Sequence, residues 1–104
     1  MLQWFKQAMG LEAEPNFREL IQSGAQIVDV RTPGEYQGGH IRGSLNLPLQ
    51  SLSSGLSKLK KDQPVITCCA SGMRSASAKS LLKAQGFQVY NGGGWLGLQS
   101  KIGK

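Results

Sequence analysis

The chain contains 104 residues, of which 39% are hydrophobic and 17% are charged, and its formal net charge is +6. A chain of this length forms a single core, so we expect one domain over residues 1–104. No apolar run reaches the roughly 20 residues that span a bilayer, which argues against a membrane protein. The lysines are scattered and few aromatic residues lie among them, so the charge favours small anions rather than nucleic acid as partners.

The first ten residues and the cysteines predict the compartment. The segment MLQWFKQAMG has one lysine and no small-residue cleavage site, so we expect no secretory signal. The two cysteines are adjacent, whereas a disulfide framework needs spaced pairs. We therefore expect a cytoplasmic protein with reduced thiols. Residues 1–15 are interpreted as an N-terminal extension, and one hypothesis packs Trp4 and Phe5 inward against the C-terminal residues.

The first elements follow from capping signals and a β-branched run. The segment 16–24 predicts a short helix with Asn16 as its N-cap and a glycine at its end. Residues 26–30, QIVDV, are too few for a helix and predict a buried strand. In the next segment, RTPGEYQGG, Thr32 and Glu35 have the spacing of a capping box, with proline at the first helical position.

The remaining segments alternate between strand and helix. Residues 44–48 predict a second strand, and the leucines within 49–59 have helical spacing. The segment 64–68, PVITC, predicts a third strand, 75–86 a helix with Ala76, Leu81 and Leu82 on its inner face, and 87–91 a last strand. This alternation predicts an α/β fold with a parallel sheet, and ligands of such folds bind at the carboxyl ends of the strands.

The glycines near the C-terminal end match a dinucleotide-binding motif by accident. The run GGGWLG, residues 92–97, has the G-x-G-x-x-G spacing of dinucleotide-binding loops. We interpret it as accidental because we expect no helix after it to receive a pyrophosphate, and no acidic residue follows about 20 positions on.

The segment CASGMRS has the properties of an anion-binding loop. Cys69 stands at the end of the third strand, Gly72 lets the loop curl, and the helix expected near Ser75 adds its positive end. Arg74 adds a full positive charge. These features lower the pKa of a thiol and bind an anion equally well. Counted to Arg74, however, the spacing is C-x4-R from Cys69 and C-x5-R from Cys68.

Three blocks of the sequence, in this order and spacing, resemble the rhodanese domain: IVDVRTPGEYQGGHIRGSLNLP, PVITCCASGMRS and GFQVYNGGG. The resemblance covers residues 16–95 and implies a three-layer α/β fold, with a small, mostly parallel central sheet and helices on both faces. It implies that Cys69 is the catalytic cysteine, and that the substrate- and persulfide-binding loop consists of Ala70, Ser71, Gly72, Met73, Arg74 and Ser75. It also implies that the glycines after residue 91 and Trp95 lie near the active-site wall.

Two observations favour Cys69 over Cys68. Gly72 falls three residues after Cys69, where the short loop of the family has its glycine. Side chains also alternate along a strand, so the two cysteines cannot both face the loop. Whether the Cys68 thiol is wholly passive stays open.

The resemblance implies a sulfurtransferase that needs no cofactor. Cys69 would take a sulfur from thiosulfate or a similar small anionic donor, and the persulfide would pass it to cyanide, a thiol or a protein acceptor. We expect a monomer. One alternative is a phosphatase or arsenate reductase of the same fold, in which Cys68 is the nucleophile and the loop has the longer C-x5-R spacing. The other is a non-catalytic sulfur carrier or interaction module.

The remaining polar residues have structural interpretations. Asp29 and Arg31 are interpreted as a charge network at a strand end, with the rim of the active site as the alternative. Glu35 is explained as the capping partner of Thr32. His40, the only histidine, is interpreted as a packed turn residue rather than a base. We expect no metal site, because structural zinc needs four separated ligands.

Overall fold

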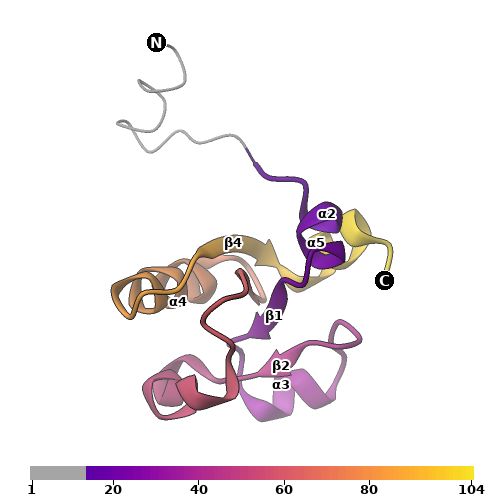
Figure 1. Cartoon of the computed structure of the whole chain (residues 1–104). Coiled ribbons are helices and arrows are strands. Elements are labelled where there is room, and N and C mark those ends of the chain that lie inside the picture. The colour runs from indigo at the N-terminus through magenta and orange to yellow at the C-terminus, as the bar shows by residue number, and fades with distance from the viewer. Residues whose placement is uncertain (1–13) are drawn as a thin grey trace.

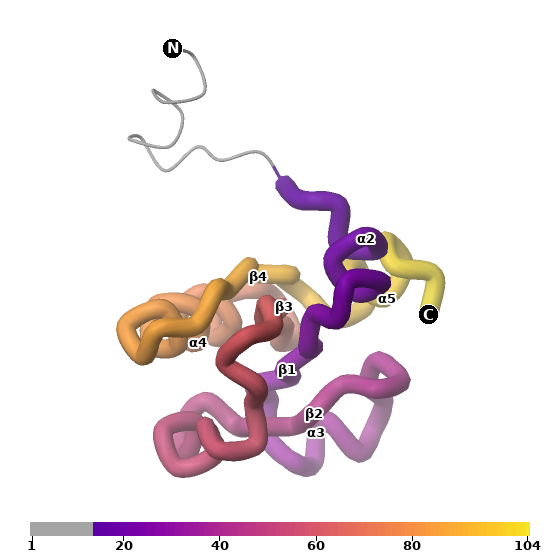
Figure 2. Tube along the Cα trace, viewed as in Figure 1, coloured from indigo at the N-terminus to yellow at the C-terminus, as the bar shows by residue number. Residues whose placement is uncertain are grey.

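A four-stranded parallel sheet forms the centre of the protein. The computed structural model describes residues 14–104, and its strands lie in the order β2-β1-β3-β4. Their bounds are β1 Gln26–Asp29, β2 Leu45–Asn46, β3 Val65–Cys69 and β4 Val89–Gly94. Every pairing between neighbouring strands is parallel, so all carboxyl ends lie at the same end of the sheet. Figures 1 and 2 show where the labelled strands lie in the fold. The predicted parallel sheet is confirmed.

Helices cover both faces of this sheet, as expected for three layers. The helical segments are α2 Phe17–Gln22, α3 Pro33–Gln37, the 3-10 segment η1 Leu49–Lys58, α4 Met73–Ala84 and α5 Trp95–Ile102. Side chains of η1 and α4 share one core cluster, and side chains of α2 and α5 share the other. The elements α2 and α5, from opposite ends of the described chain, pack side by side (Figure 1).

The alternation of side chains along β3 divides the core into these two clusters. Val65 and Cys69 belong to the cluster under α4, whereas Ile66 and Cys68 belong to the cluster under α2 and α5. All four side chains are fully buried. The two adjacent sulfur atoms therefore lie on opposite faces of the sheet, as the period of a strand requires.

The predicted helix caps are present. The Asn16 side chain accepts a hydrogen bond from the Glu19 N–H at the start of α2. At α3, the Thr32 hydroxyl accepts from the Glu35 N–H and the Glu35 carboxylate accepts from the Thr32 N–H, which completes the capping box. Local sequence thus sets where these two helices begin.

Two helices differ from the prediction. Helix α4 begins at Met73 instead of residue 75, and it buries Ser75, Ala78 and Leu82, while Ala76 is exposed. The burial follows the three- and four-residue spacing of a helix counted from this earlier start.

The expectation of no helix after the glycines was wrong, because α5 occupies Trp95–Ile102. Its buried residues, Leu98 and Ile102, are one helical turn apart, but Gly97 weakens the helical signal of so short a segment. Strand β4 also continues through Gly94, beyond the predicted end at residue 91. The hypothesis about Trp4 and Phe5 concerns positions outside the described residues.

A membrane-crossing helix is not found within residues 14–104, where each helix is too short or too polar for that purpose.

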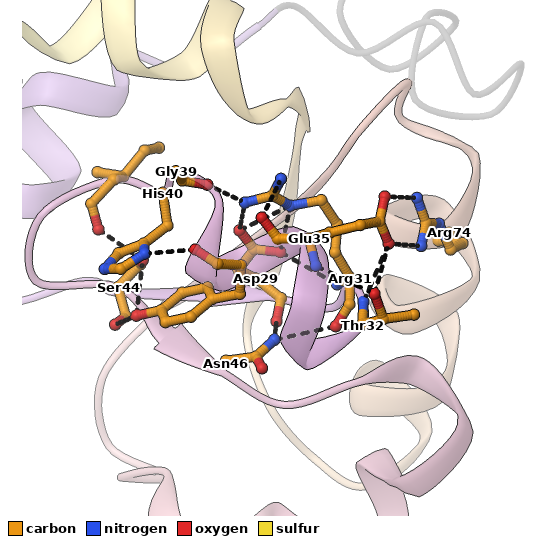
Figure 3. Close-up of polar contacts among 11 residues, drawn as sticks. Asp29, Arg31, Thr32, Glu35, Gly39, His40, Ser44, Asn46 and Arg74 are labelled. Carbon is orange, nitrogen blue, oxygen red and sulfur yellow. Dashed lines mark hydrogen bonds and ion pairs between the residues drawn. The ribbon is translucent and has the colours of Figure 1, made fainter.

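A buried ion pair holds the carboxyl end of β1. The Arg31 Nε donates to Asp29 Oδ1 at 2.9 Å and Nη2 donates to Oδ2 at 2.7 Å, and the two side chains are 5% and 0% exposed. Arg31 Nη2 also donates to the Gly39 carbonyl at 2.7 Å, and Nη1 to the Glu35 carbonyl at 3.3 Å (Figure 3). Its guanidinium lies 4.8 Å from the centre of the Trp95 ring. One side chain thus joins β1, α3 and the start of α5.

We predict that Asp29→Asn lowers the free energy of unfolding by about 3–5 kcal/mol, because it leaves the Arg31 charge buried and unpaired. Urea denaturation measures the change. The matched control is Lys101→Ala, which breaks an exposed ion pair with Glu14 and is expected to cost no more than about 1 kcal/mol. Equal costs for the two variants would contradict a structural role for the buried pair.

Candidate active site

The Cys69 sulfur lies inside a ring of hydrogen-bond donors at the end of β3. Its Sγ accepts from the Gly72 N–H at 2.9 Å and from the Ser75 N–H at 3.4 Å. In the thiol form, the S–H donates to the Ser75 hydroxyl oxygen at 3.5 Å. The side chain is fully buried, so the loop itself covers the sulfur.

The loop curls because its glycine adopts a conformation that other residues avoid. Gly72 has a φ of 100° and occupies the N-cap of α4, which turns the chain from the strand into the helix within three residues. The N-terminus of α4 therefore points its free N–H groups at the sulfur.

Strand β4 shapes the other side of the loop. Between the pairs Thr67–Asn91 and Cys69–Gly94, β3 advances by two residues and β4 by three. This irregularity brings the end of β4 against the loop, and a Cβ on Gly94 would lie 2.8 Å from the Ala70 carbonyl oxygen. Gly93 and Gly94 thus stand beside the predicted loop, whereas Gly92 packs against Ile66 and Leu98. Any side chain at Gly94 would displace the loop.

The pKa values of the two thiols are shifted in opposite directions. Burial raises the pKa of Cys69, but hydrogen bonds from the Ser75 hydroxyl and from the N–H groups of Ser75, Gly72 and Ser71 outweigh it and leave the pKa below its ordinary value. Burial raises the pKa of Cys68 to about 12, with a further contribution from the Asp29 carboxylate. Cys69 is therefore the thiol that ionises first as the pH rises, and Cys68 stays protonated at neutral pH.

Arg74 forms an ion pair with Glu35, for which the sequence predicted only a helix-capping role. Its two terminal nitrogens donate to the two Glu35 carboxylate oxygens at 2.7 and 3.0 Å. Glu35 lies between Arg74 and the Asp29–Arg31 pair (Figure 3). The Arg74 hydrogen bonds, followed by that from the Thr32 N–H, lower the pKa of Glu35 to about 2. The positive charge of the loop is therefore neutralised locally while this pair is intact.

The other candidate residues divide between the loop surface and the frame. Ala70, Ser71 and Met73 are exposed, and Met73 is 79% exposed. Asp29 and Arg31 bond to each other and to the backbone rather than to the loop, which favours the structural interpretation.

His40 is exposed to solvent, although its ring packs against one neighbouring side chain. Its ring stacks on Tyr36 at 3.7 Å, and its Nδ1 lies 2.7 Å from the Tyr36 carbonyl oxygen. Nothing in these contacts supports a catalytic base. Within residues 14–104, no three His, Cys, Asp or Glu side chains gather as a metal site would require.

Comparison with known proteins gives consistent results. The sequence model of the rhodanese-like domain matches residues 15–101. The chain is 40% identical over 68 residues to the uncharacterized protein YqhL of Bacillus subtilis, a match that covers 64% of this chain and 54% of that protein. The chain thus spans about half the length of this relative.

Two further relatives have named activities. The chain is 40% identical over 75 residues to the thiosulfate sulfurtransferase GlpE of Ectopseudomonas mendocina, which covers 71% of this chain and 69% of GlpE. Among solved structures, the human single-domain sulfurtransferase TSTD1 matches with a TM-score of 0.70 at 28% identity. That match covers 84% of this chain and 92% of TSTD1.

The surroundings of the two sulfurs predict two separate thiolate titrations. Ultraviolet thiolate absorbance should show one step below the ordinary cysteine range and a second near the Cys68 pKa of about 12. Difference curves against Cys69→Ser and Cys68→Ser separate each sulfur from tyrosine ionisation. The low step should vanish in Cys69→Ser and persist in Cys68→Ser, and the reverse pattern would contradict the assignment.

Proposed function

Because the chain belongs to the rhodanese-like domain family, we propose that it is a sulfurtransferase that moves a sulfane sulfur through a persulfide on Cys69. The observation that carries the proposal is the Cys69 sulfur itself, with its lowered pKa and its ring of N–H donors. The named activities of GlpE and TSTD1 give independent support.

The proposed reaction has two half-steps at one sulfur atom. The Cys69 thiolate attacks the outer sulfur of thiosulfate, a new S–S bond forms, and sulfite leaves with the electrons of the broken S–S bond. A cyanide ion or an acceptor thiolate then attacks the outer sulfur of the persulfide, and the Cys69 thiolate is restored. Neither half-step needs an added oxidant, reductant or cofactor.

The loop supplies what both half-steps require. The same N–H donors that stabilise the thiolate also suit a persulfide anion, because each form carries its negative charge at this end of the strand. The net charge of +6 favours a small anionic donor. The alternative that uses Cys68 and the C-x5-R count has less support, because that sulfur lies on the opposite face of the sheet. Residence in the cytoplasm and a monomeric state stay predictions.

We expect thiosulfate treatment to add the mass of one sulfur atom to the protein. Cys69→Ser should abolish this gain because it removes the nucleophile, and Cys68→Ser, which leaves the donor ring intact, should retain it. Intact-protein mass spectrometry measures both. A gain that depends on Cys68, or turnover of an aryl phosphate or arsenate that depends on Cys68, would overturn the proposal. Steady-state turnover with cyanide distinguishes an enzyme from a sulfur carrier, which would load but turn over poorly.

We predict that Glu35→Gln lowers the KM for thiosulfate by roughly two- to tenfold, because it frees the Arg74 charge to attract a dianion. Glutamine still completes the capping box, so α3 should be retained. Steady-state kinetics at low ionic strength measure the effect, which salt should weaken.

The matched control for this variant is Glu19→Gln. Glu19 holds the equivalent third position of α2, a helix that packs on the opposite face of the sheet from α4, and its substitution should leave KM unchanged. An unchanged or raised KM in Glu35→Gln would show that Arg74 does not act as a binding charge limited by its pairing with Glu35.

A further inference from the structure

The side chain of Asn91 makes three hydrogen bonds, two of them to the loop and one within β4. It lies in β4 opposite Thr67, and its Oδ1 accepts from the Ser75 hydroxyl at 2.6 Å and from the Gly93 N–H at 2.9 Å. Its Nδ2 donates to the Gly72 carbonyl at 3.3 Å. The oxygen faces two donors and the nitrogen faces an acceptor, so the orientation of the amide is fixed by its partners.

Two of these partners belong to residues that surround the Cys69 sulfur. Gly72 donates its N–H to Sγ at 2.9 Å, and the Ser75 hydroxyl oxygen lies 3.5 Å from Sγ. The same hydroxyl lies closer to Asn91 Oδ1, at 2.6 Å, and donates its proton there. We propose that Asn91 is a positioning residue, which directs the Ser75 hydroxyl proton away from the Cys69 sulfur and so limits how strongly Ser75 stabilises the thiolate.

The Ser75 hydroxyl has a single proton and several acceptors. In the thiol form, Cys69 donates to the Ser75 oxygen, and the hydroxyl proton goes to Asn91 or to the Gly72 carbonyl at 3.0 Å. When the sulfur becomes an anion, the hydroxyl proton can turn toward it only by breaking its bond to Asn91, because the hydroxyl has no second proton. The bond to Asn91 therefore favours the thiol form of Cys69 over the thiolate.

The charged groups around the sulfur do not include Asn91 and stay in place when it is changed. They are the Arg74–Glu35 pair, which joins α4 to α3, the Asp29–Arg31 pair at the end of β1, and the Cys68 thiol on the opposite face. A change in Cys69 acidity on substitution of the neutral Asn91 therefore reports on the hydrogen bonds rather than on a lost charge.

The test is the thiolate titration of Cys69 in Asn91→Ala. We expect the pKa of Cys69 to fall by about one unit, which is up to a tenfold larger thiolate fraction, because the Ser75 proton no longer has Asn91 as a competing acceptor. In the Ser75→Ala background, the same substitution should shift the pKa by less than half as much, because the group it positions is already missing. Asn91→Thr, whose β-branched side chain suits a strand but is too short to join all three partners, should shift it in the same direction.

The matched control is Gln88→Ala. Gln88 precedes β4 and carries the same amide group, but it donates to the Tyr90 hydroxyl at 2.6 Å on the exposed surface, and its loss should leave the pKa unchanged. An unchanged or raised pKa in the folded Asn91 variants would overturn the proposal. So would an equal shift in the Ser75→Ala background, since the effect would then bypass the hydroxyl.

The inference rests on Cys69 as the reacting sulfur of the proposed function, but its test does not need sulfur transfer. Thiolate absorbance reads the acidity of the sulfur in the absence of donor and acceptor. A failure to load sulfur with a normal Asn91 effect would therefore count against the proposed reaction alone, and loading with no Asn91 effect would count against the positioning role alone.

Discussion

The buried ion pair between Asp29 and Arg31 is the constraint on which the carboxyl edge of the sheet depends. Two charges removed from water are tolerated only if nearly all their hydrogen-bonding groups find partners. Arg31 meets this condition by binding the Gly39 and Glu35 carbonyls and by lying over Trp95. These contacts fix the position of α3. They therefore also place the Glu35 carboxylate, which pairs with Arg74, a residue 39 positions later in the sequence.

The acidity of Cys69 comes mainly from dipoles rather than from a free cation. Arg74 is neutralised by Glu35, whereas the peptide N–H groups of the loop and the start of α4 point at the sulfur. Fixed dipoles in a site closed to water stabilise an anion without having to reorganise when it forms. The conformation of Gly72 and the close approach of β4 therefore matter as much as any charged side chain.

Local sequence signals predicted most of the fold, but fewer of the contacts in the candidate active site. The β-branched runs predicted the strands, the N-cap at Asn16 and the capping box at Thr32 were confirmed, and the alternation along β3 placed the two cysteines on opposite faces. The partnership of Glu35 with Arg74 could not be predicted, because its capping role already explained the acid. The contacts of Asn91 could not be predicted either, because its partners in the loop come near it only when β4 lies beside the loop.

Because most donors to the sulfur are peptide N–H groups, they are present whichever side chains the loop carries. Ala70, Ser71 and Met73 are exposed, and their exchange for other residues would remove no donor. The outer surface of the loop and the environment of the sulfur are therefore separable by mutation. An engineered variant could change the exposed surface of the loop, and relatives could diverge there, while the hydrogen bonds to the sulfur stay the same.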